Sequence, residues 1–240
     1  MKRSNHRIML FAALVGMLVL GCEAREATVV TPSSEITAED VISRTHRAMR
    51  EQESLYFRLK DADRSTAILP GFTLIEAYGD VGPGGQLAAT LELLASEDRG
   101  LFVRVEIRTI DGRTYVTNPV NGRWEFSPQA FMPLNFTNLG RNLARILVTM
   151  SDLNSFGITN LEGADVYYMK GVIESDAFDI IVAEAARGRT VEAEVWIDAE
   201  TWVLRRATLK GSIVRGASES NMLTLELSRY GEQVIIEPPN

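Results

Sequence analysis

The residue with the clearest chemical role is Cys22, the one cysteine among the 240 residues. It directly follows Val19-Leu20-Gly21, at the end of the uncharged apolar run Ile8–Leu20, which a basic head with Lys2 and Arg3 precedes. This order is typical of a bacterial lipobox, in which the thiol receives a diacylglyceryl group, the signal is cut and the new N-terminus is acylated. Thirteen apolar residues make a helix of about 20 Å, too short for a bilayer core of about 30 Å. An ordinary export signal, or an uncleaved anchor, with an incidental cysteine is the alternative.

A lipobox divides the chain into three parts. We expect a lipoprotein signal peptide over residues 1–21, a flexible tether with lipidated Cys22 over 22–35, and a single domain over 36–240. Removal of residues 1–21 takes away three of 25 basic residues and none of 32 acidic ones, which leaves a net charge of about −10. Such an acidic chain is not expected to bind nucleic acid, or to dock electrostatically on anionic lipid heads. With one cysteine, itself modified, no disulfide can form within the chain.

Residue types that catalyse reactions or bind metals are scattered along the rest of the sequence. His46 is the only histidine after the signal, and it has no cysteine or second histidine nearby. Most acidic residues alternate with apolar ones, which is typical of a solvated sheet face (Glu92, Glu106, Glu192, Glu194, Glu226). Trp124, Trp196 and Trp202 are interpreted as sheet packing rather than a sugar platform. No G-x-S-x-G, H-E-x-x-H or S-x-x-K motif occurs. We therefore predict no enzymatic activity, no catalytic residue, no metal and no cofactor.

The periodicity of the apolar residues predicts how the domain is built. A spacing of three and four predicts helices over 38–52, with Thr37 as the N-cap, and over 139–150. An Ala- and Ile-rich segment predicts a third, short helix over 176–186. Alternation with period two predicts about ten strands, and Asp111-Gly112 is typical of a two-residue hairpin turn. The long stretches without helices exclude a doubly wound parallel sheet, so we predict an α+β domain with a curved antiparallel sheet.

Several motifs resemble, in order and spacing, the LppX/LprG (LppX_LprAFG) family of lipid-carrying bacterial lipoproteins. Besides the lipobox and the two longer helices, they are Asn121–Pro128 (NGRWEFSP), Val195–Asp198 (VWID) with Trp202–Arg205 (WVLR), and Leu227–Val234 (LSRYGEQV). The resemblance implies a half-barrel similar to the LolA and LolB carriers. In that fold a strongly bent antiparallel sheet turns its concave side to the helices, and a hydrophobic cavity lies between them.

If the resemblance holds, the apolar residues of alternating strands face the cavity, and residues 131–150 form its rim or lid. The candidate ligand-binding residues are Leu55, Phe57, Leu59, Leu91, Leu93, Leu101, Val103, Val105, Ile107, Phe131, Phe136, Leu143, Ile146, Leu147, Val195, Ile197, Leu223 and Leu225. The resemblance supplies no catalytic residue, and Cys22 is the one functional position that it carries over directly.

The function that follows from the resemblance is lipid carriage. We expect a monomeric lipoprotein that binds acylated lipids or glycolipids and takes part in their transport or localisation across the cell envelope. It would be held in the cell membrane by its lipid anchor and face the extracytoplasmic side, with a lipid transporter as a candidate partner. An envelope sensor or assembly factor that binds a protein through the same half-barrel is one alternative. A hydrolase that uses scattered carboxylates is another.

Overall fold

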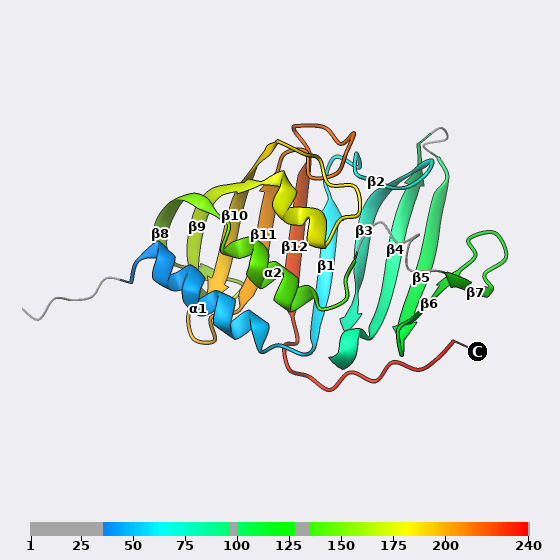
Figure 1. Ribbon diagram of the computed structural model, residues 1–240, viewed down its shortest axis with the longest axis horizontal. Helices are drawn as coiled ribbons and strands as arrows, with labels where there is room; N and C mark the ends of the chain where they lie inside the picture. Colours follow the sequence, from blue (N-terminus) through cyan, green and yellow to red (C-terminus); the bar gives the residue numbers. More distant parts are fainter. Residues whose placement is uncertain (1–35, 97–99, 128–134, 240) are drawn as a thin grey trace, which may run out of the picture. The chain divides into compact units, whose positions relative to one another are not determined.

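An unclosed, curved antiparallel sheet dominates the computed structural model, which describes residues 36–96, 100–127 and 135–239 (Figure 1). The twelve strands of the described residues are β1 (Leu55–Asp61), β2 (Ala67–Leu69), β3 (Phe72–Val81), β4 (Leu87–Ala95), β5 (Phe102–Ile110), β6 (Arg113–Thr117), β7 (Trp124–Ser127), β8 (Ser151–Leu161), β9 (Ala164–Glu174), β10 (Thr190–Asp198), β11 (Leu204–Lys210) and β12 (Met222–Ser228). The α+β class and the curved antiparallel sheet are confirmed.

The sheet has two wings that meet in the middle. Its order is β7-β6-β5-β4-β3-β1-β12-β11-β10-β9-β8, and the short β2 pairs with β3. The N-terminal half of the domain thus forms one wing and the C-terminal half forms the other. The β1–β12 pairing joins them, with Phe57 opposite Leu227 and Leu59 opposite Leu225. Because side chains alternate across a strand, these apolar pairs all lie on one face, which we call the inner face.

Two α-helices, α1 (Ala38–Arg50) and α2 (Leu139–Leu147), lie over the inner face of β8–β12 and β1 (Figure 1). Thr37 begins α1 with a capping box, since the Thr37 hydroxyl accepts from the Asp40 amide and the Asp40 carboxylate accepts from the Thr37 amide. Both helices begin where the sequence predicts and end two or three residues earlier. At Gly140 the helices approach closely, because a Cβ there would lie 3.2 Å from the Met49 carbonyl oxygen.

The prediction of a third helix over 176–186 is wrong. A 3₁₀ helix, η3, covers Ser175–Ile180, and the chain then turns back to the sheet. The amide of Ala186 donates to the Ile213 carbonyl at 2.7 Å, and Ala185 forms an isolated bridge with Val214. These pairings with the β11–β12 connection satisfy the backbone in place of helical hydrogen bonds, so tertiary context overrides local propensity.

Two local features shape the wing of β3 to β7. Asp111 and Gly112 both have positive φ (51° and 73°), as expected for a primed hairpin turn, and Ile110 pairs with Arg113 across it. At Gly79 the strands β3 and β4 come very close. A Cβ on Gly79 would lie 2.1 Å from the Ala88 carbonyl oxygen, so this position requires glycine.

Candidate functional site

The inner face of the sheet is a continuous apolar surface that both wings supply. Fourteen of the predicted site residues belong to its buried cluster, namely Leu55, Phe57, Leu91, Leu93, Val105, Ile107, Phe136, Leu143, Ile146, Leu147, Val195, Ile197, Leu223 and Leu225. Leu59 and Val103 are partly buried and pack against this cluster. The described part of the chain thus brings together nearly all the residues that alternation selected.

Three predicted positions are not part of this cluster. Leu101 is 50% exposed, and it precedes β5, which begins at Phe102 with 63% exposure. The end of the β4–β5 hairpin therefore extends beyond the buried face. The alternation of apolar residues does not reveal where the buried part of a strand ends. Phe131 and Cys22, together with the signal and tether over 1–35, lie outside the described residues, so their roles stay predictions.

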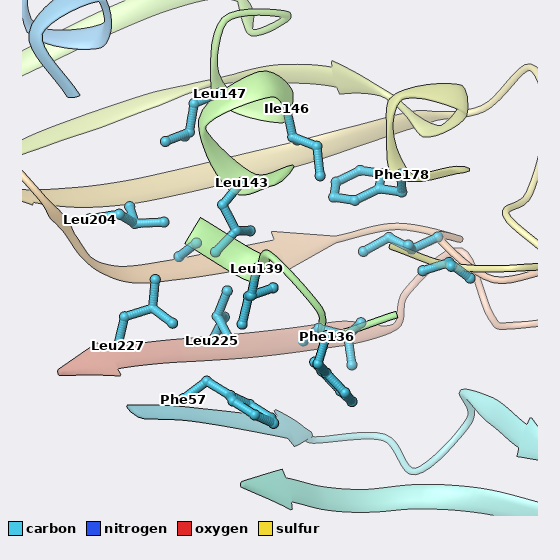
Figure 2. Close-up of a cluster of buried hydrophobic side chains, with 14 of the residues drawn as sticks. Phe57, Phe136, Leu139, Leu143, Ile146, Leu147, Phe178, Leu204, Leu225 and Leu227 are labelled. Atoms are coloured by element: carbon cyan, nitrogen blue, oxygen red, sulfur yellow. The ribbon is translucent and has the colours of Figure 1, made fainter. Parts of the chain in front are cut away.

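Helix α2 and the residues before it close the middle of the inner face. Figure 2 shows Leu139 and Leu143 pointing from α2 towards Leu225 and Leu204 of the strands. The ring of Phe136 stacks on that of Phe57, with centroids 4.4 Å apart and an interplanar angle of 19°. The offset contact of two rings adds about 0.5–1.5 kcal/mol beyond their buried area. The segment before α2 is thus anchored to β1 by a purely apolar contact.

An apolar cavity of about 60 Å³ lies between α2, η3 and the sheet. The candidate residues Leu59, Leu143, Leu223 and Leu225 are among those that line it, and no polar surface is exposed in it. Its volume equals that of about two water molecules in the liquid, whereas pockets for drug-sized ligands measure about 300–1,000 Å³. The helix layer and the sheet are therefore nearly in full contact in this state.

Part of the cavity wall comes from irregular segments that sequence reasoning missed. Phe178, Ile181 and Val182 reach it from η3 and the turn after it, and Ile213 and Val214 reach it from the β11–β12 connection. These segments have no periodicity that would assign a face. Their clustered apolar residues were the available signal.

Apolar contact, without polar bonds, attaches α2 to the strands. In the part of the chain that the structure describes, no hydrogen bond or ion pair joins residues 139–147 to the sheet. The side chain of Asn142 donates to the Thr137 carbonyl just before the helix, and Thr149 bonds back to Ile146 just after it. Moving α2 away from the sheet would therefore leave no buried polar group without a partner, which is the costly outcome in a protein interior.

Helix α1 is fixed more firmly, at the β10–β11 turn. The Arg44 guanidinium lies 4.6 Å from the centre of the Trp202 ring, and Trp202 stacks on Tyr167 at 5.2 Å. Trp202 has a φ of 63°, a left-handed conformation that is unusual for a bulky residue. The sulfur of Met49 also accepts a hydrogen bond from the Leu204 amide at 3.4 Å. α1 thus has specific contacts with the sheet that α2 lacks.

Hydrogen bonds of Asp198 and Tyr230 stabilise the β10–β11 turn. Burial alone would raise the pKa of Asp198, but hydrogen bonds from the Thr201 amide and hydroxyl, from Arg205 and from the Glu200 amide keep this pKa below its usual value. The Tyr230 hydroxyl donates to the Leu204 carbonyl, and burial raises the pKa of this phenol well above its ordinary value. Both groups keep one protonation state at neutral pH and support the strained Trp202.

A second, polar pocket of about 400 Å³ lies where α1 ends and α2 begins. Its polar lining residues are Arg50, Glu51, Gln52, Glu53, Asn138 and Arg141, and glycines of the β3–β4 turn complete it. Leu139 lines both this pocket and the apolar cavity. The polar pocket and the apolar cavity are therefore neighbours at Leu139.

Within the ranges 36–96, 100–127 and 135–239, no group of three or more His, Cys, Asp or Glu side chains could hold a metal ion. Those same ranges contain no helix long and apolar enough to cross a membrane.

On the outer face of the sheet, the carboxylate of Glu194 contacts both Lys170 and Tyr168. A hydrogen bond from Lys170, helped by one from Tyr168, lowers the pKa of Glu194 despite partial burial. This arrangement is an ion pair that supports two strands.

An unclosed antiparallel sheet, with an apolar inner face that two short helices cover, defines a half-barrel protein. The chain belongs to the LppX_LprAFG lipoprotein family, whose sequence pattern matches residues 37–236. The family predicted from the motifs is thereby confirmed.

Relatives and solved structures agree with this assignment. The chain is 27% identical over 176 residues to the lipoarabinomannan carrier protein LprG of Mycobacterium tuberculosis and of Mycobacterium bovis, with 71% of this chain and 70% of that protein covered. LprF from Mycobacterium bovis superposes with a TM-score of 0.66 at 16% identity, covering 84% of this chain and 96% of LprF. Mycobacterium tuberculosis LppX gives 0.55 at 18% identity, covering 83% and 97%. The two structures show the shared fold.

Proposed function

We propose that this protein is a membrane-anchored lipoprotein that binds the acyl chains of a lipid or glycolipid between its helices and the inner face of its sheet. It would take part in the transport or localisation of that lipid across the cell envelope. The observation that carries the proposal is the continuous apolar inner face, against which α2 is held by apolar contacts alone. The similarity to LprG, which is named as a lipoarabinomannan carrier, supports it.

Binding would replace side-chain contacts by acyl-chain contacts. Because lipid tails are as apolar as leucine, hydrocarbon can take the place of Leu139 and Leu143 against the sheet without loss of burial. Each methylene moved out of water contributes about 0.8 kcal/mol, so a long chain offsets the separation of α2 from the strands. The cavity of about 60 Å³ is the closed state of this site, and α2 moves outward when a chain enters.

The polar pocket beside Leu139 is suited to the head group. Arg50 and Arg141 come from different helices to one pocket, and within the described residues neither forms an ion pair with a carboxylate. Guanidinium groups bind phosphate and carboxylate well, and Glu51 and Glu53 can accept hydrogen bonds from hydroxyls. A lipid with its chains beyond Leu139 and its head group among these residues would have each part in a matching environment.

The N-terminal segment would place the domain where such a ligand is found. Lipidation of Cys22 adds acyl chains that hold the protein on the membrane, and two or more chains anchor far more stably than one. The thirteen residues that follow Cys22, 23–35, can span at most about 45 Å when extended. Replacing Cys22 by Ala is expected to leave the precursor uncut or to release the protein from the membrane fraction.

The proposal is tested by lipid that purifies with the domain. Residues 36–240 are produced in a bacterial cytoplasm without detergent, and bound lipid is extracted and identified by mass spectrometry. We expect about one multi-acyl lipid per protein, and a marked loss in L225W, which fills the cavity from the sheet side. T224W is the matched control, since Thr224 is the preceding residue of β12 and faces outward. Protein that is empty, and that takes up no lipid from vesicles, would overturn the proposal.

A further inference from the structure

A hollow of about 310 Å³ lies on the opposite, outer face of the sheet, over β1, β3, β4, β5 and β7. It arises from cross-strand register. Asp80, Ala88 and Arg108 stand side by side on β3, β4 and β5, and Tyr78, Thr90 and Glu106 form the next row. Because β4 contributes only the short Ala88 and Thr90, the surface dips between the longer side chains of its neighbours.

Three aromatic side chains form the walls of this hollow. They are Tyr56 of β1, Tyr78 of β3 and Trp124 of β7, all partly buried. Arg229 lies 4.4 Å from the centre of the Tyr56 ring, and its other side is ion-paired to Asp80. The rings and charges around the dip are therefore tied to one another.

At the opposite wall of the hollow, Arg108 contacts the ring of Trp124, as Arg229 contacts that of Tyr56. Its guanidinium lies 5.0 Å from the centre of the Trp124 ring and donates to the Glu237 carbonyl at 3.0 Å. The C-terminal segment thus holds both walls, through Arg229 on one side and Glu237 on the other. A preorganised site loses little freedom when it binds a ligand.

The polar groups of these walls are available to a ligand. Across the ranges that the structure describes, the hydroxyls of Tyr56 and Tyr78 and the indole N–H of Trp124 have no hydrogen-bond partner. The carboxylate of Glu106 forms no ion pair there, and the hydroxyl of Thr90 lies on the floor. The hollow therefore combines aromatic ring surface with donors and acceptors at its edges.

The balance of charge selects the chemistry of the ligand. Asp80 and Glu106 offset Arg108 and Arg229 around the hollow, and the whole chain carries an excess of acidic residues. A phosphate or another anion would gain little from such surroundings. A sugar ring has an apolar face for the aromatic walls and a rim of hydroxyls for the edge groups, and it has no charge. We infer that this hollow is a second binding site, on the outer face, for a neutral saccharide.

The inference is independent of lipid binding, because the hollow shares no side chain with the apolar cavity or the polar pocket. Its test uses the full chain in detergent, probed with a panel of neutral oligosaccharides of glucose, mannose, arabinose and N-acetylglucosamine. Tryptophan fluorescence and saturation-transfer NMR report binding. We expect at least one member of the panel to bind, and W124A to weaken that binding at least tenfold.

The matched control for W124A is F126A. Phe126 lies on the same strand and, two residues on, faces the same side, but it is 63% exposed and outside the hollow. Since W124A removes packing from an edge strand, T90W is the second variant, because it fills the hollow from its floor. We expect W124A and T90W both to lose sugar binding and to keep their lipid content, and T90W to keep its melting temperature. Two results would overturn the inference. One is that no sugar of the panel binds, and the other is that T90W and F126A weaken binding equally.

Discussion

The inner and outer faces of the same strands are built from opposite kinds of interaction. On the outer face, ion pairs link neighbouring strands. Glu92–Arg104 at 2.9 Å and Arg206–Glu226 at 2.8 Å join residues directly opposite each other, and Arg58–Glu76 at 2.6 Å joins a diagonal pair. The inner face has apolar side chains that meet an apolar helix layer. Directional bonds therefore fix the shape of the sheet from its outer face. The inner contacts are non-directional, and other hydrocarbon can replace them.

The helix layer repeats this difference on a smaller scale. α1 has a cation–π contact, a sulfur hydrogen bond and a capping box. Within the described residues α2 has none of these and packs on the strands through apolar side chains such as Leu139 and Leu143. We therefore expect α1 to stay in place and α2 to move when a ligand enters. Hydrogen exchange would show this as faster exchange of the α2 amides than of the α1 amides.

The largest difference in stability is expected between two variants of β12 that place the same charge on its inner or its outer face. L225D puts a carboxylate among apolar side chains, and an unpaired buried charge costs about 3–5 kcal/mol. T224D puts the same group on the outer face beside Lys60 and should change stability by no more than about 0.5 kcal/mol. Urea unfolding of both variants measures the difference. Equal losses would mean that the two faces are not distinct.

Truncating a side chain of α2 should destabilise the empty protein more than the lipid-loaded protein. L143A removes buried methyl groups next to the cavity, which costs about 2–5 kcal/mol when the protein is empty. A bound acyl chain would fill that space, so the loss should shrink once lipid is added. R145A, on the exposed side of the same helix, is the control and should have little effect. A loss at Leu143 that lipid leaves unchanged would contradict the exchange of side chains for hydrocarbon.

The β10–β11 turn gives a pH-dependent test of how α1 is held. Hydrogen bonds keep the pKa of Asp198 below its unfolded value of about 3.9, so its carboxylate stabilises the fold above that pH. This contribution is lost as pH falls through the lowered pKa. D198N should cost about 1.5–3 kcal/mol at neutral pH, and the gap from the natural protein should narrow below about pH 4. A gap that is constant with pH would exclude the charge as the cause.

The smallest expected effect is a change in head-group selectivity when the polar pocket at the helix ends loses its charge. R50Q/R141Q removes both arginines of the pocket, and R47Q/R145Q removes the same charge from exposed positions on the same two helices. We expect R50Q/R141Q to lower the ratio of anionic to neutral phospholipid taken up by a few fold, while the total amount of bound lipid stays the same. Vesicle uptake with both lipid types measures the ratio. An identical ratio in both variants would place the head group elsewhere.

Much of the inner face could be predicted because its cause is local. Strict alternation assigned Phe57, Val105, Val195 and Leu225 to one face, and burial follows from that assignment. Phe178 and Val214 could not be assigned, since their segments are irregular and a long-range pairing positions them. The third helix was predicted from composition and failed for the same reason.

The outer hollow could not be predicted at all. It depends on which residues of β3 and β5 stand beside Ala88, and register across strands is not visible in a single sequence. Trp124 was accordingly interpreted as ordinary sheet packing. Its place beside Arg108, at the wall of a hollow, became evident only from the folded arrangement.

Photo-crosslinking can show directly whether acyl chains bind on the inner face of the sheet or on the outer face. The domain is loaded with a phospholipid that carries a diazirine in its acyl chain, irradiated and analysed by tandem mass spectrometry to locate the labelled side chains. Within β12 and α2 we expect label at Leu223, Leu225 and Leu143, which line the closed cavity. Label at Thr224 or Glu226, which face outward between them, would contradict the account.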